Sequence, residues 1–274
     1  METLFEKVTV ARNFLENHLD YIPENAIILG TGLGKLVNDV VNPVHIPYRN
    51  IPHFPTSTAP SHAGEMVIGR IEDKEVILLN GRFHYYEGYS AEDITFPIRL
   101  LKDLGVKNLI ITNAAGGINP HFETGDIVTV HDHINFIPDH PLRGPNDERF
   151  GPRFPDMMEA YNPQLLKYAR KAYENLGLTY KSGIYVALQG PSLETPAEYK
   201  FARIIGGDLV GMSTVPEVIM AHYCGIRTLV FSLVSNVCFP LTRLTETTVE
   251  EVVETAEKAT PRLTSLIKEV IRHF

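Results

Sequence analysis

The sequence predicts an α/β fold, because short apolar runs rich in β-branched residues alternate along the chain with helical patterns. Its 274 residues, 44% of them apolar, can bury a sizeable core. We find no linker, internal repeat or low-complexity tract that would divide the chain. The expected organisation is therefore a single domain over residues 1–274.

The predicted strands are short, and several are apolar at every position, which is typical of strands buried on both faces of a sheet. They cover residues 26–30, 66–71, 75–79, 108–112, 126–130, 183–188 and 228–234. Helical patterns cover residues 93–104, 163–176, 196–205, 216–224 and 248–274. In the last of these, Thr248 and Glu251 fit a capping box, and Pro261 should kink or split the helix. The polar, proline-bearing region 134–156 is expected to be an ordered functional loop.

Charge and cysteine content exclude several classes of protein. A net charge of −8 argues against nucleic acid as a partner, because a phosphate backbone requires a basic surface. The start METLFEKVTV is charged where a signal peptide is apolar, and no apolar run reaches membrane-spanning length. Cys224 and Cys238 are too few for a disulfide framework. We expect a cytoplasmic protein that binds no membrane and holds any anion in a pocket.

The stretch LLNGRFHYYEG places three polar side chains, Arg82, His84 and Tyr86, at intervals of two. In an extended segment they would share one face, while Phe83 and Tyr85 would point the other way. A guanidinium beside an imidazole favours an anion with an organic body, and phosphate in particular. Taken singly, the arginine could form a surface ion pair. The histidine could be a buried residue whose hydrogen bonds are satisfied within the protein.

Glycine-rich turns are expected where two of the strands end. GTGLGKL (30–36) has the spacing of neither well-known phosphate motif, since its outer glycines are separated by three residues and leucine follows the lysine. Its backbone N–H groups and the Thr31 hydroxyl could still cradle one anion, and a plain tight turn is equally consistent. TNAAGG (112–117) is expected to be a second turn. Ligands of open α/β sheets gather at such strand ends, so both turns and the arginine segment could surround one site.

Three further stretches place polar residues in apolar surroundings. Glu194 precedes a helix that starts with proline, so it either favours the helix dipole or accepts hydrogen bonds from a ligand. Ser213 or Thr214 can cap the following helix, with Glu217 as the partner in a capping box. Asn236 ends a buried strand, where an amide is often a simple turn former.

Two histidines alternate on a predicted strand, and alternate histidines can bind zinc. His131 and His133 have Asp139 and His140 nearby in the sequence, which raises the alternative of a metal hydrolase. The spacing matches no ligand pattern, and satisfied strand histidines explain it more simply. We therefore expect no metal site.

Seven stretches taken together resemble one family. They are GTGLG, SHAGE, GRFHYYEGY, TNAAGGIN, HPLRGPNDERFG, GPSLET and VGMSTVPEV, and they follow in order from about residue 26 to 240. In all of them the sequence is similar to the trimeric class of purine nucleoside phosphorylases. The resemblance implies a central mixed sheet with a smaller barrel-like sheet, surrounded by helices, and assembly as a homotrimer.

The resemblance also implies a reaction and its residues. Inorganic phosphate cleaves the N-glycosidic bond of a purine nucleoside with inversion, giving the free base and ribose or deoxyribose 1-phosphate, with no metal or organic cofactor. The family's phosphate contacts carry over to Thr31, His62, Arg82, His84, the N–H of Ala114, and Ser213. Its ribose contacts carry over to Tyr86, Met212 and, from the neighbouring subunit, Phe154. Its base contacts carry over to Asn113, Glu194, Val210 and Asn236. The expected catalytic residues are His84, Glu194 and Asn236.

Two positions depart from the family pattern. Leu193 stands where the family usually stacks an aromatic residue on the base, which should weaken purine packing. Val249 aligns, across a one-residue deletion, with the histidine that contacts the sugar 5′-hydroxyl, and valine cannot hydrogen-bond it. The related methylthioadenosine phosphorylases are also apolar there, so 5′-modified nucleosides are an alternative substrate. Against it, those enzymes usually carry aspartate in place of Asn236 and lack the Glu194 equivalent.

The base contacts predict a preference and a test. Glu194 would accept a hydrogen bond from N1–H of a 6-oxopurine, and neutral adenine has no such hydrogen, so inosine and guanosine are the expected substrates. Two other classes stay open: a nucleoside-binding protein without turnover would need no phosphate, and a hydrolase would release free ribose. Phosphate dependence separates all three.

Overall fold

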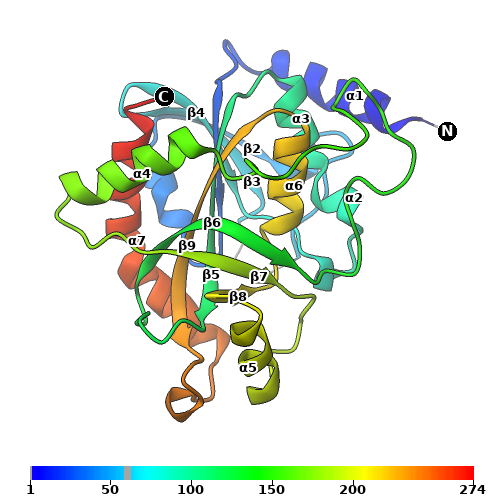
Figure 1. Cartoon of the computed structure of the whole chain (residues 1–274). Coiled ribbons are helices and arrows are strands. Elements are labelled where there is room, and N and C mark those ends of the chain that lie inside the picture. The colour runs from blue at the N-terminus through cyan, green and yellow to red at the C-terminus, as the bar shows by residue number, and fades with distance from the viewer. Residues whose placement is uncertain (1, 59–62) are drawn as a thin grey trace.

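The computed structural model describes residues 2–58 and 63–274 (Figure 1). Strands and helices alternate through most of the chain, as predicted. The strands are β1 (Asn25–Leu29), β2 (Val41–Pro47), β3 (Glu65–Ile71), β4 (Lys74–Asn80), β5 (Asn108–Gly117), β6 (Ile127–Asn135), β7 (Ser182–Ala187), β8 (Leu209–Gly211) and β9 (Arg227–Val237). The helices are α1 (Leu4–Glu16), α2 (Ala91–Ile94), α3 (Phe96–Asp103), α4 (Pro163–Asn175), α5 (Pro196–Ile204), α6 (Val215–Tyr223) and α7 (Val249–Ile271).

The strands of the described ranges form one mixed sheet in the order β2-β3-β4-β1-β5-β8-β7-β6-β9. An additional pairing of β5 with β9 closes the last five strands of that order into a barrel. Strands β4, β1, β5 and β9 run parallel to one another, whereas β2 and β3 form an antiparallel extension beside β4. The expected mixed sheet with a smaller barrel is therefore confirmed.

Helices cover the sheet from both sides, and this explains the apolar strands. On one side α3 contacts both α1 and α6, while α4 and α7 pack together on the other (Figure 1). On β5, Leu109 and Ile111 belong to the first core and Ile110, between them, belongs to the second. Successive side chains are thus buried against opposite helical layers. The strand has no solvent-facing side chains, so its sequence shows no alternation of apolar and polar residues.

Three elements were not predicted from the sequence. Strand β2 carries Asn42, Pro43 and Pro47 and is mostly exposed, so it lacks the apolar pattern of a strand. Strand β8 has only three residues and no pattern to detect. Helix α1 is amphipathic, and its start is marked by a capping box of Thr3 and Glu6 that the expectation for the N-terminus did not include.

Two local predictions were wrong, and a third was wrong in part. TNAAGG is not a turn, because β5 continues through Gly117 and pairs with β9 along its length. Pro261 does not split the last helix, which runs unbroken from Val249 to Ile271. Strand β4 ends at Asn80, and Tyr86 lies in a short 3-10 helix (Tyr85–Glu87), so Arg82, His84 and Tyr86 do not alternate on a strand.

Candidate active site

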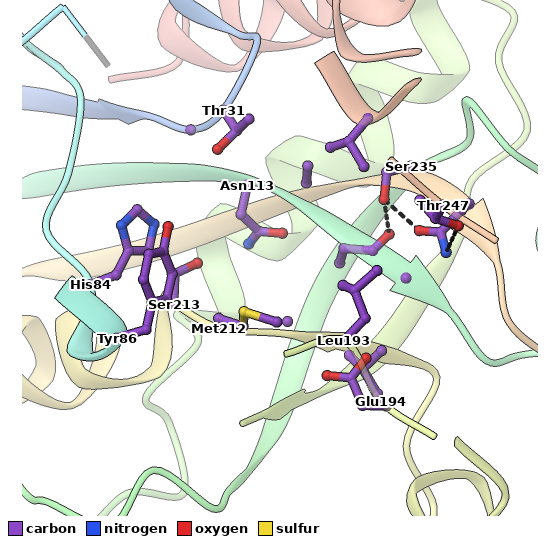
Figure 2. A pocket seen from close by; sticks show the side chains of 18 of the residues that line it. Thr31, His84, Tyr86, Asn113, Leu193, Glu194, Met212, Ser213, Ser235 and Thr247 are labelled. Atoms are coloured by element: carbon purple, nitrogen blue, oxygen red, sulfur yellow. Dashed lines mark hydrogen bonds between the residues drawn. The ribbon is translucent and has the colours of Figure 1, made fainter. Parts of the chain in front are cut away.

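A cavity of about 160 Å³ opens where parallel strands β1, β4, β5 and β9 end (Figure 2). Strand ends, the segment before α5, the segment after β8 and the start of α7 all contribute to its wall. The lining residues are Gly30, Thr31, Arg82, His84, Tyr86, Asn113, Ala114, Ala115, Gly116, Leu193, Glu194, Tyr199, Val210, Gly211, Met212, Ser213, Ser235, Asn236, Thr247 and Val252. The carboxyl edge of the parallel strands is where ligands of α/β sheets bind.

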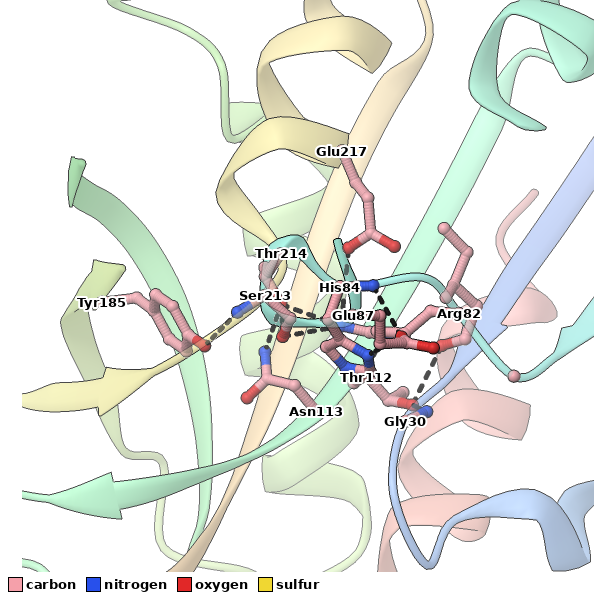
Figure 3. Close-up of polar contacts among 12 residues, drawn as sticks. Gly30, Arg82, His84, Glu87, Thr112, Asn113, Tyr185, Ser213, Thr214 and Glu217 are labelled. Carbon is pink, nitrogen blue, oxygen red and sulfur yellow. Dashed lines mark hydrogen bonds and ion pairs between the residues drawn. The ribbon is translucent and has the colours of Figure 1, made fainter. Parts of the chain in front are cut away.

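Arg82 is the buried cation of this cavity (Figure 3). Its Nη1 donates at 3.0 Å to the hydroxyls of both Ser213 and Thr214, and its Nη2 donates to the carbonyl of Thr112. Glu217 supplies the counter-charge, with 3.4 Å between Oε2 and Nη1. Glu217 is therefore an ion-pair partner, and its expected role as a capping-box partner is wrong because the start of α6 has no side-chain cap.

Thr214, at the start of α6, holds this arrangement together in a strained conformation. Its φ is +71°, a region that β-branched residues rarely adopt. Its hydroxyl accepts hydrogen bonds from Arg82 Nη1 and from Asn113 Nδ2, each at 3.0 Å. One oxygen of the strained turn thereby fixes two pocket residues, Arg82 after β4 and Asn113 on β5.

His84 is oriented by a carboxylate three residues later. Glu87 Oε1 accepts from the backbone N of His84 at 2.8 Å and lies 2.7 Å from its Nδ1. Burial acts to raise the pKa of Glu87, but hydrogen bonds from His84 and Thr58 outweigh it and lower that pKa to about 2. The carboxylate is thus ionised and only accepts, so Nδ1 of His84 carries a proton and donates to it. The ring of Tyr86 stacks on that of His84, with 4.7 Å between the ring centroids.

The turn after β1 lies against β5 with no room for a side chain. Gly30 N donates to the Thr112 hydroxyl at 3.1 Å, and a Cβ on Gly30 would lie 2.6 Å from the Thr112 carbonyl oxygen. This close approach places Thr31 at the wall of the cavity beside Ala114. Glycine is therefore required here by packing.

The opposite end of the cavity carries a carboxylate and an amide. Glu194 precedes α5, whose N-cap is Thr195 and whose capping box is completed by Glu198. Burial raises the pKa of Glu194, and hydrogen bonds from its own backbone and from Tyr199 oppose part of that rise. A partly buried carboxylate with a raised pKa, facing a cavity, is suited to recognising a hydrogen-bond donor on a ligand.

Asn236, at the end of β9, has its amide fixed by the protein. Its Nδ2 donates to Cys238 Sγ at 3.1 Å and to Thr247 Oγ1 at 3.2 Å, which uses both amide hydrogens. Its Oδ1 lies 2.8 Å from the Ser235 hydroxyl, which can donate to it. The carbonyl oxygen retains one lone pair, so in this orientation the amide is an acceptor towards a ligand.

The structure brings together nearly all residues that the resemblance assigned. Thr31, Arg82, His84, Ala114, Ser213, Tyr86, Met212, Asn113, Glu194, Val210 and Asn236 all line the one cavity. His62 lies outside the described residues. Phe154 lies elsewhere, in a second hollow, and its side chain is 87% exposed. Val249 is 68% exposed at the first turn of α7, while Val252 and Thr247 line the cavity in its place.

Four lining residues were missed by sequence reasoning. They are Tyr199, Ser235, Thr247 and Val252. Ser235 precedes Asn236 and its hydroxyl lies 3.2 Å from the Ala115 carbonyl as well as near the amide. The sequence signal for Thr247 is its place directly before Thr248, the N-cap of α7. Tyr199 had no such signal, because it reads as a core residue of α5.

The two alternating histidines lie on β6 in different surroundings. His133 Nδ1 lies 3.1 Å from the Tyr161 hydroxyl, and burial lowers the pKa of His133. His131 is exposed on β6. Within residues 2–58 and 63–274 no group of three or more His, Cys, Asp or Glu is placed to hold a metal ion. None of the helices in these ranges is long and apolar enough to cross a membrane.

Comparison with known proteins identifies the class to which this fold and cavity belong. The model of the phosphorylase superfamily matches residues 25–272, which is nearly the whole chain. The matched span contains every strand of the described sheet and the whole cavity lining.

Individual relatives narrow the assignment. The chain is 46% identical over 269 residues to purine nucleoside phosphorylase 1 of Geobacillus stearothermophilus, covering 96% of both chains. It is 43% identical over 269 residues to the purine nucleoside phosphorylase of Bos taurus, covering 96% of this chain and 93% of the other. The chain belongs to the purine nucleoside phosphorylase family, within the phosphorylase superfamily.

Solved structures agree with this assignment. A purine nucleoside phosphorylase of Schistosoma mansoni in complex with adenosine superposes with a TM-score of 0.92 at 39% identity, covering 97% of this chain and 96% of the other. Isoform 2 from the same organism, in complex with cytosine and ribose-1-phosphate, gives a TM-score of 0.93 at 40% identity with the same coverage.

Proposed function

We propose that the protein cleaves inosine, guanosine and their deoxy forms with inorganic phosphate, releasing the purine base and ribose or deoxyribose 1-phosphate. One observation carries this proposal: a single cavity holds a buried guanidinium with hydroxyl donors at one end and a carboxylate with an amide at the other. Phosphate and purine are the two groups that such ends recognise, and a sugar fits between them.

The phosphate end is built around Arg82. Its guanidinium, the Ser213 hydroxyl and the His84 ring converge on the cavity, with Thr31 and the N–H of Ala114 beside them. A cation and several donors in a buried site bind a phosphate dianion strongly. The sequence match adds His62 to this set.

The sugar lies between the two ends, beside Tyr86 and Met212. As the glycosidic bond breaks, positive charge grows on the sugar ring and negative charge spreads into the purine. Phosphate held beneath the ring by Arg82 and His84 is positioned as the nucleophile, and its charge stabilises the cationic ring. Inversion at the anomeric carbon follows from attack on the face opposite the departing base.

Asn236 stabilises the departing base as charge develops on it. Both hydrogens of its Nδ2 are engaged by Cys238 and Thr247, so its carbonyl oxygen is the group that meets the purine. That oxygen accepts from N7–H once the departing base is protonated at N7. The amide therefore favours the protonated leaving group, which exists only as the bond breaks.

Glu194 selects the base. Its carboxylate accepts from N1–H of a 6-oxopurine and from the 2-amino group of guanine, and Asn113 and Val210 complete the base end. Adenine has no N1–H when neutral, so its complex lacks this bond. A relative of known structure binds adenosine, and binding of that nucleoside here is compatible with slow turnover. Leu193 is 53% exposed at this end and offers an aliphatic surface where an aromatic ring would stack.

We infer that the functional form is a homotrimer in which Phe154 completes the neighbour's sugar site. Phe154 is 87% exposed and does not line the cavity of its own chain. The adjacent Arg153 donates to the carbonyls of Leu142 at 3.1 Å and Gly144 at 2.8 Å. These hydrogen bonds fix the loop that carries the ring. An exposed aromatic ring on a fixed loop is suited to inserting into a site of the neighbouring subunit.

A second candidate substrate is a 5′-modified nucleoside, such as 5′-methylthioadenosine. The observation that favours it is the apolar Val252, which lines the cavity three residues after Val249, the residue that aligns with the family's histidine for the 5′-hydroxyl. Glu194 and Asn236 favour the 6-oxopurine nucleosides instead.

The deciding experiment measures base release from inosine, guanosine, adenosine and 5′-methylthioadenosine, each with and without phosphate. Rapid phosphate-dependent release from inosine and guanosine alone is the expected result. Release chiefly from the methylthio substrate would transfer the assignment to the second candidate. Cleavage without phosphate would indicate a hydrolase, and binding without cleavage would indicate a nucleoside-binding protein.

A further inference from the structure

Thr247 lies where the segment between β9 and α7 meets the base end of the substrate cavity (Figure 2). A second cavity, of about 360 Å³, adjoins this end, and three residues line both cavities: Ser235, Asn236 and Thr247. The hydrogen bond from Asn236 Nδ2 to Thr247 Oγ1, 3.2 Å long, is therefore part of the wall between them. The amide proposed to meet the base is thus held, in part, by a residue of the connecting segment.

The Thr247 hydroxyl acts as an acceptor towards this amide. Its oxygen accepts from Asn236 Nδ2, and its single hydrogen has an acceptor in the backbone carbonyl of Thr245, 3.4 Å from Oγ1. A carbonyl can only accept, so the hydroxyl hydrogen is directed to Thr245 and the hydroxyl oxygen faces the amide. This arrangement favours the amide nitrogen over the amide oxygen as the neighbour of Thr247.

The other contacts of Asn236 agree with the same orientation. Cys238 Sγ accepts from the second hydrogen of Nδ2 at 3.1 Å. The hydroxyl of Ser235 lies 2.8 Å from Oδ1 and can donate to it. Rotating the amide by half a turn would place Oδ1 against the Thr247 oxygen, whose hydrogen is used elsewhere, so two acceptors would face each other. Thr247 thus favours the orientation in which Oδ1 meets the base.

The position of Thr247 is set by the start of α7. Thr248, the next residue, is the N-cap of that helix: its hydroxyl accepts from Glu251 N at 3.2 Å, and its own N donates to Glu251 Oε2 at 3.0 Å. Earlier in the segment, Arg243 Nη1 donates to Glu123 Oε1 at 3.1 Å, which ties the segment to the loop between β5 and β6. These contacts on both sides of Thr247 keep its hydroxyl beside the amide.

We propose that Thr247 is a positioning residue for the purine: it holds the Asn236 amide with its carbonyl oxygen towards N7 of the base. The inference rests on the proposed function, because it assigns a task to a residue that acts on a purine contact. Recognition of the base at N7 thereby depends on the segment that leads into α7.

The first test compares two bases that differ only at position 7. Hypoxanthine has a tautomer with a hydrogen on N7, which can donate to Asn236 Oδ1, whereas 7-deazahypoxanthine has a C–H there and cannot. Thr247→Val removes the acceptor of the amide hydrogen and keeps the branched shape of the side chain. We expect its affinity for hypoxanthine, measured by calorimetry, to fall about fivefold, with little change for the deaza analogue. Thr247→Ser retains the hydroxyl and should bind both bases like the wild type.

Thr255→Val is the matched control. Thr255 is half-buried on α7 and lines the second cavity, but it does not line the substrate cavity. The same chemical change at this position should leave the ratio of the two affinities unchanged. Equal losses for both bases in Thr247→Val, or an equal change of the ratio in the control, would show that Thr247 acts only on packing and would overturn the inference. Should Thr247→Val fold poorly, Thr247→Ala removes the same oxygen and gives the same comparison.

The second test asks whether Thr247 acts through Asn236. The contact at N7 strengthens as the glycosidic bond breaks, so Thr247→Val should lower kcat for inosine about fivefold and change KM less. In the background of Asn236→Ala, where no amide remains to be oriented, the same substitution should change kcat little further. Full additivity of the two substitutions, or a change confined to KM, would contradict the positioning role.

Calorimetry with hypoxanthine also separates this inference from the proposed function. If the wild-type protein binds hypoxanthine but cleaves no nucleoside, the proposed function fails, and the two base affinities still decide the role of Thr247. If it cleaves inosine with phosphate and Thr247→Val matches it in both affinities and in kcat, the inference alone is overturned. If it binds neither base, both are overturned.

Discussion

Arg82 and Glu217 form an ion pair, 3.4 Å from Nη1 to Oε2, in which the side chains are only 2% and 4% exposed. A buried guanidinium needs a counter-charge at all times, whether or not phosphate is bound. Glu217 meets that need from the side of α6, and the hydroxyls of Ser213 and Thr214 occupy the same guanidinium nitrogen. The cavity is thus kept charged and pre-organised by a carboxylate that is not itself part of its lining.

Glu217→Gln should destabilise the protein and strengthen its response to phosphate. Loss of the carboxylate leaves a buried cation without its partner, which costs about 3 kcal/mol of unfolding free energy. Phosphate then becomes the main counter-charge of Arg82, so thermal unfolding should shift more per added phosphate than in the wild type. Glu24→Gln is the control, because the pair of Glu24 with Lys107 is about 60% exposed and should contribute little. An equal phosphate response in the wild type and Glu217→Gln would contradict the prediction.

Thr214→Val should impair phosphate binding while changing the shape of the side chain little. Valine keeps the branched side chain but removes the oxygen that accepts from Arg82 and Asn113. We expect the KM for phosphate to rise about tenfold, with a smaller effect on the nucleoside. Thr214→Ser retains the hydroxyl and should stay close to the wild type in steady-state kinetics. A larger change in the KM for inosine than for phosphate would place the role of Thr214 at the other end of the cavity.

The sequence predicted the alternation of elements and most of the cavity, and the reasons for its failures are physical. Arg82, Glu194 and Asn236 stand in motifs that resemble those of one family, so their convergence was predictable although the extended conformation predicted for residues 82–86 was wrong. Glu217 was read as a local helix cap, because a partner 135 positions away in the chain, Arg82, leaves no local pattern. Tyr199 and Cys238 look like ordinary core residues for the same reason.

Glu87→Gln should remove stability only where the carboxylate is ionised. The folded pKa of Glu87 is about 2, below the ordinary value of 4.5, so its contribution is fully present above 4.5 and is lost as the pH falls towards 2. Urea unfolding should therefore show a deficit of about 1 to 3 kcal/mol near neutral pH that shrinks below pH 4.5. A deficit that stays constant down to pH 3 would show that Glu87 does not titrate as described. Because Glu87 holds His84, kcat should fall as well.

Gly116→Ala should close the base end of the cavity. An added Cβ would lie 2.9 Å from Cys238 Sγ, 3.0 Å from Val210 Cγ2 and 3.7 Å from Asn236 Oδ1. Crowding of this kind costs about 1 to 3 kcal/mol and should displace the amide, so the KM for inosine should rise and hypoxanthine affinity should fall. Gly177→Ala, in an exposed turn with φ +64° and open space around it, should lose stability through backbone strain without changing either binding constant. Unchanged hypoxanthine binding in Gly116→Ala would show that the base does not reach β5.

Phe154→Ala tests the proposed trimer through its effect on the sugar site. The ring is 87% exposed in the isolated chain and contributes nothing to its own cavity, so its loss should leave the stability of the protomer unchanged. If it covers the neighbour's ribose, the KM for inosine should rise by roughly tenfold or more, since a buried aromatic contact is worth about 1.5 to 3 kcal/mol. The KM for phosphate should change less, because the phosphate end is enclosed by residues of a single chain. Met158→Ala, at a side chain that is 88% exposed on the same loop, is the control and should leave all constants unchanged. Analytical ultracentrifugation of both variants separates loss of the ring from loss of the assembly: a trimer with an unchanged KM would overturn the placement of Phe154, whereas a monomer with wild-type kinetics would overturn the need for a trimer altogether.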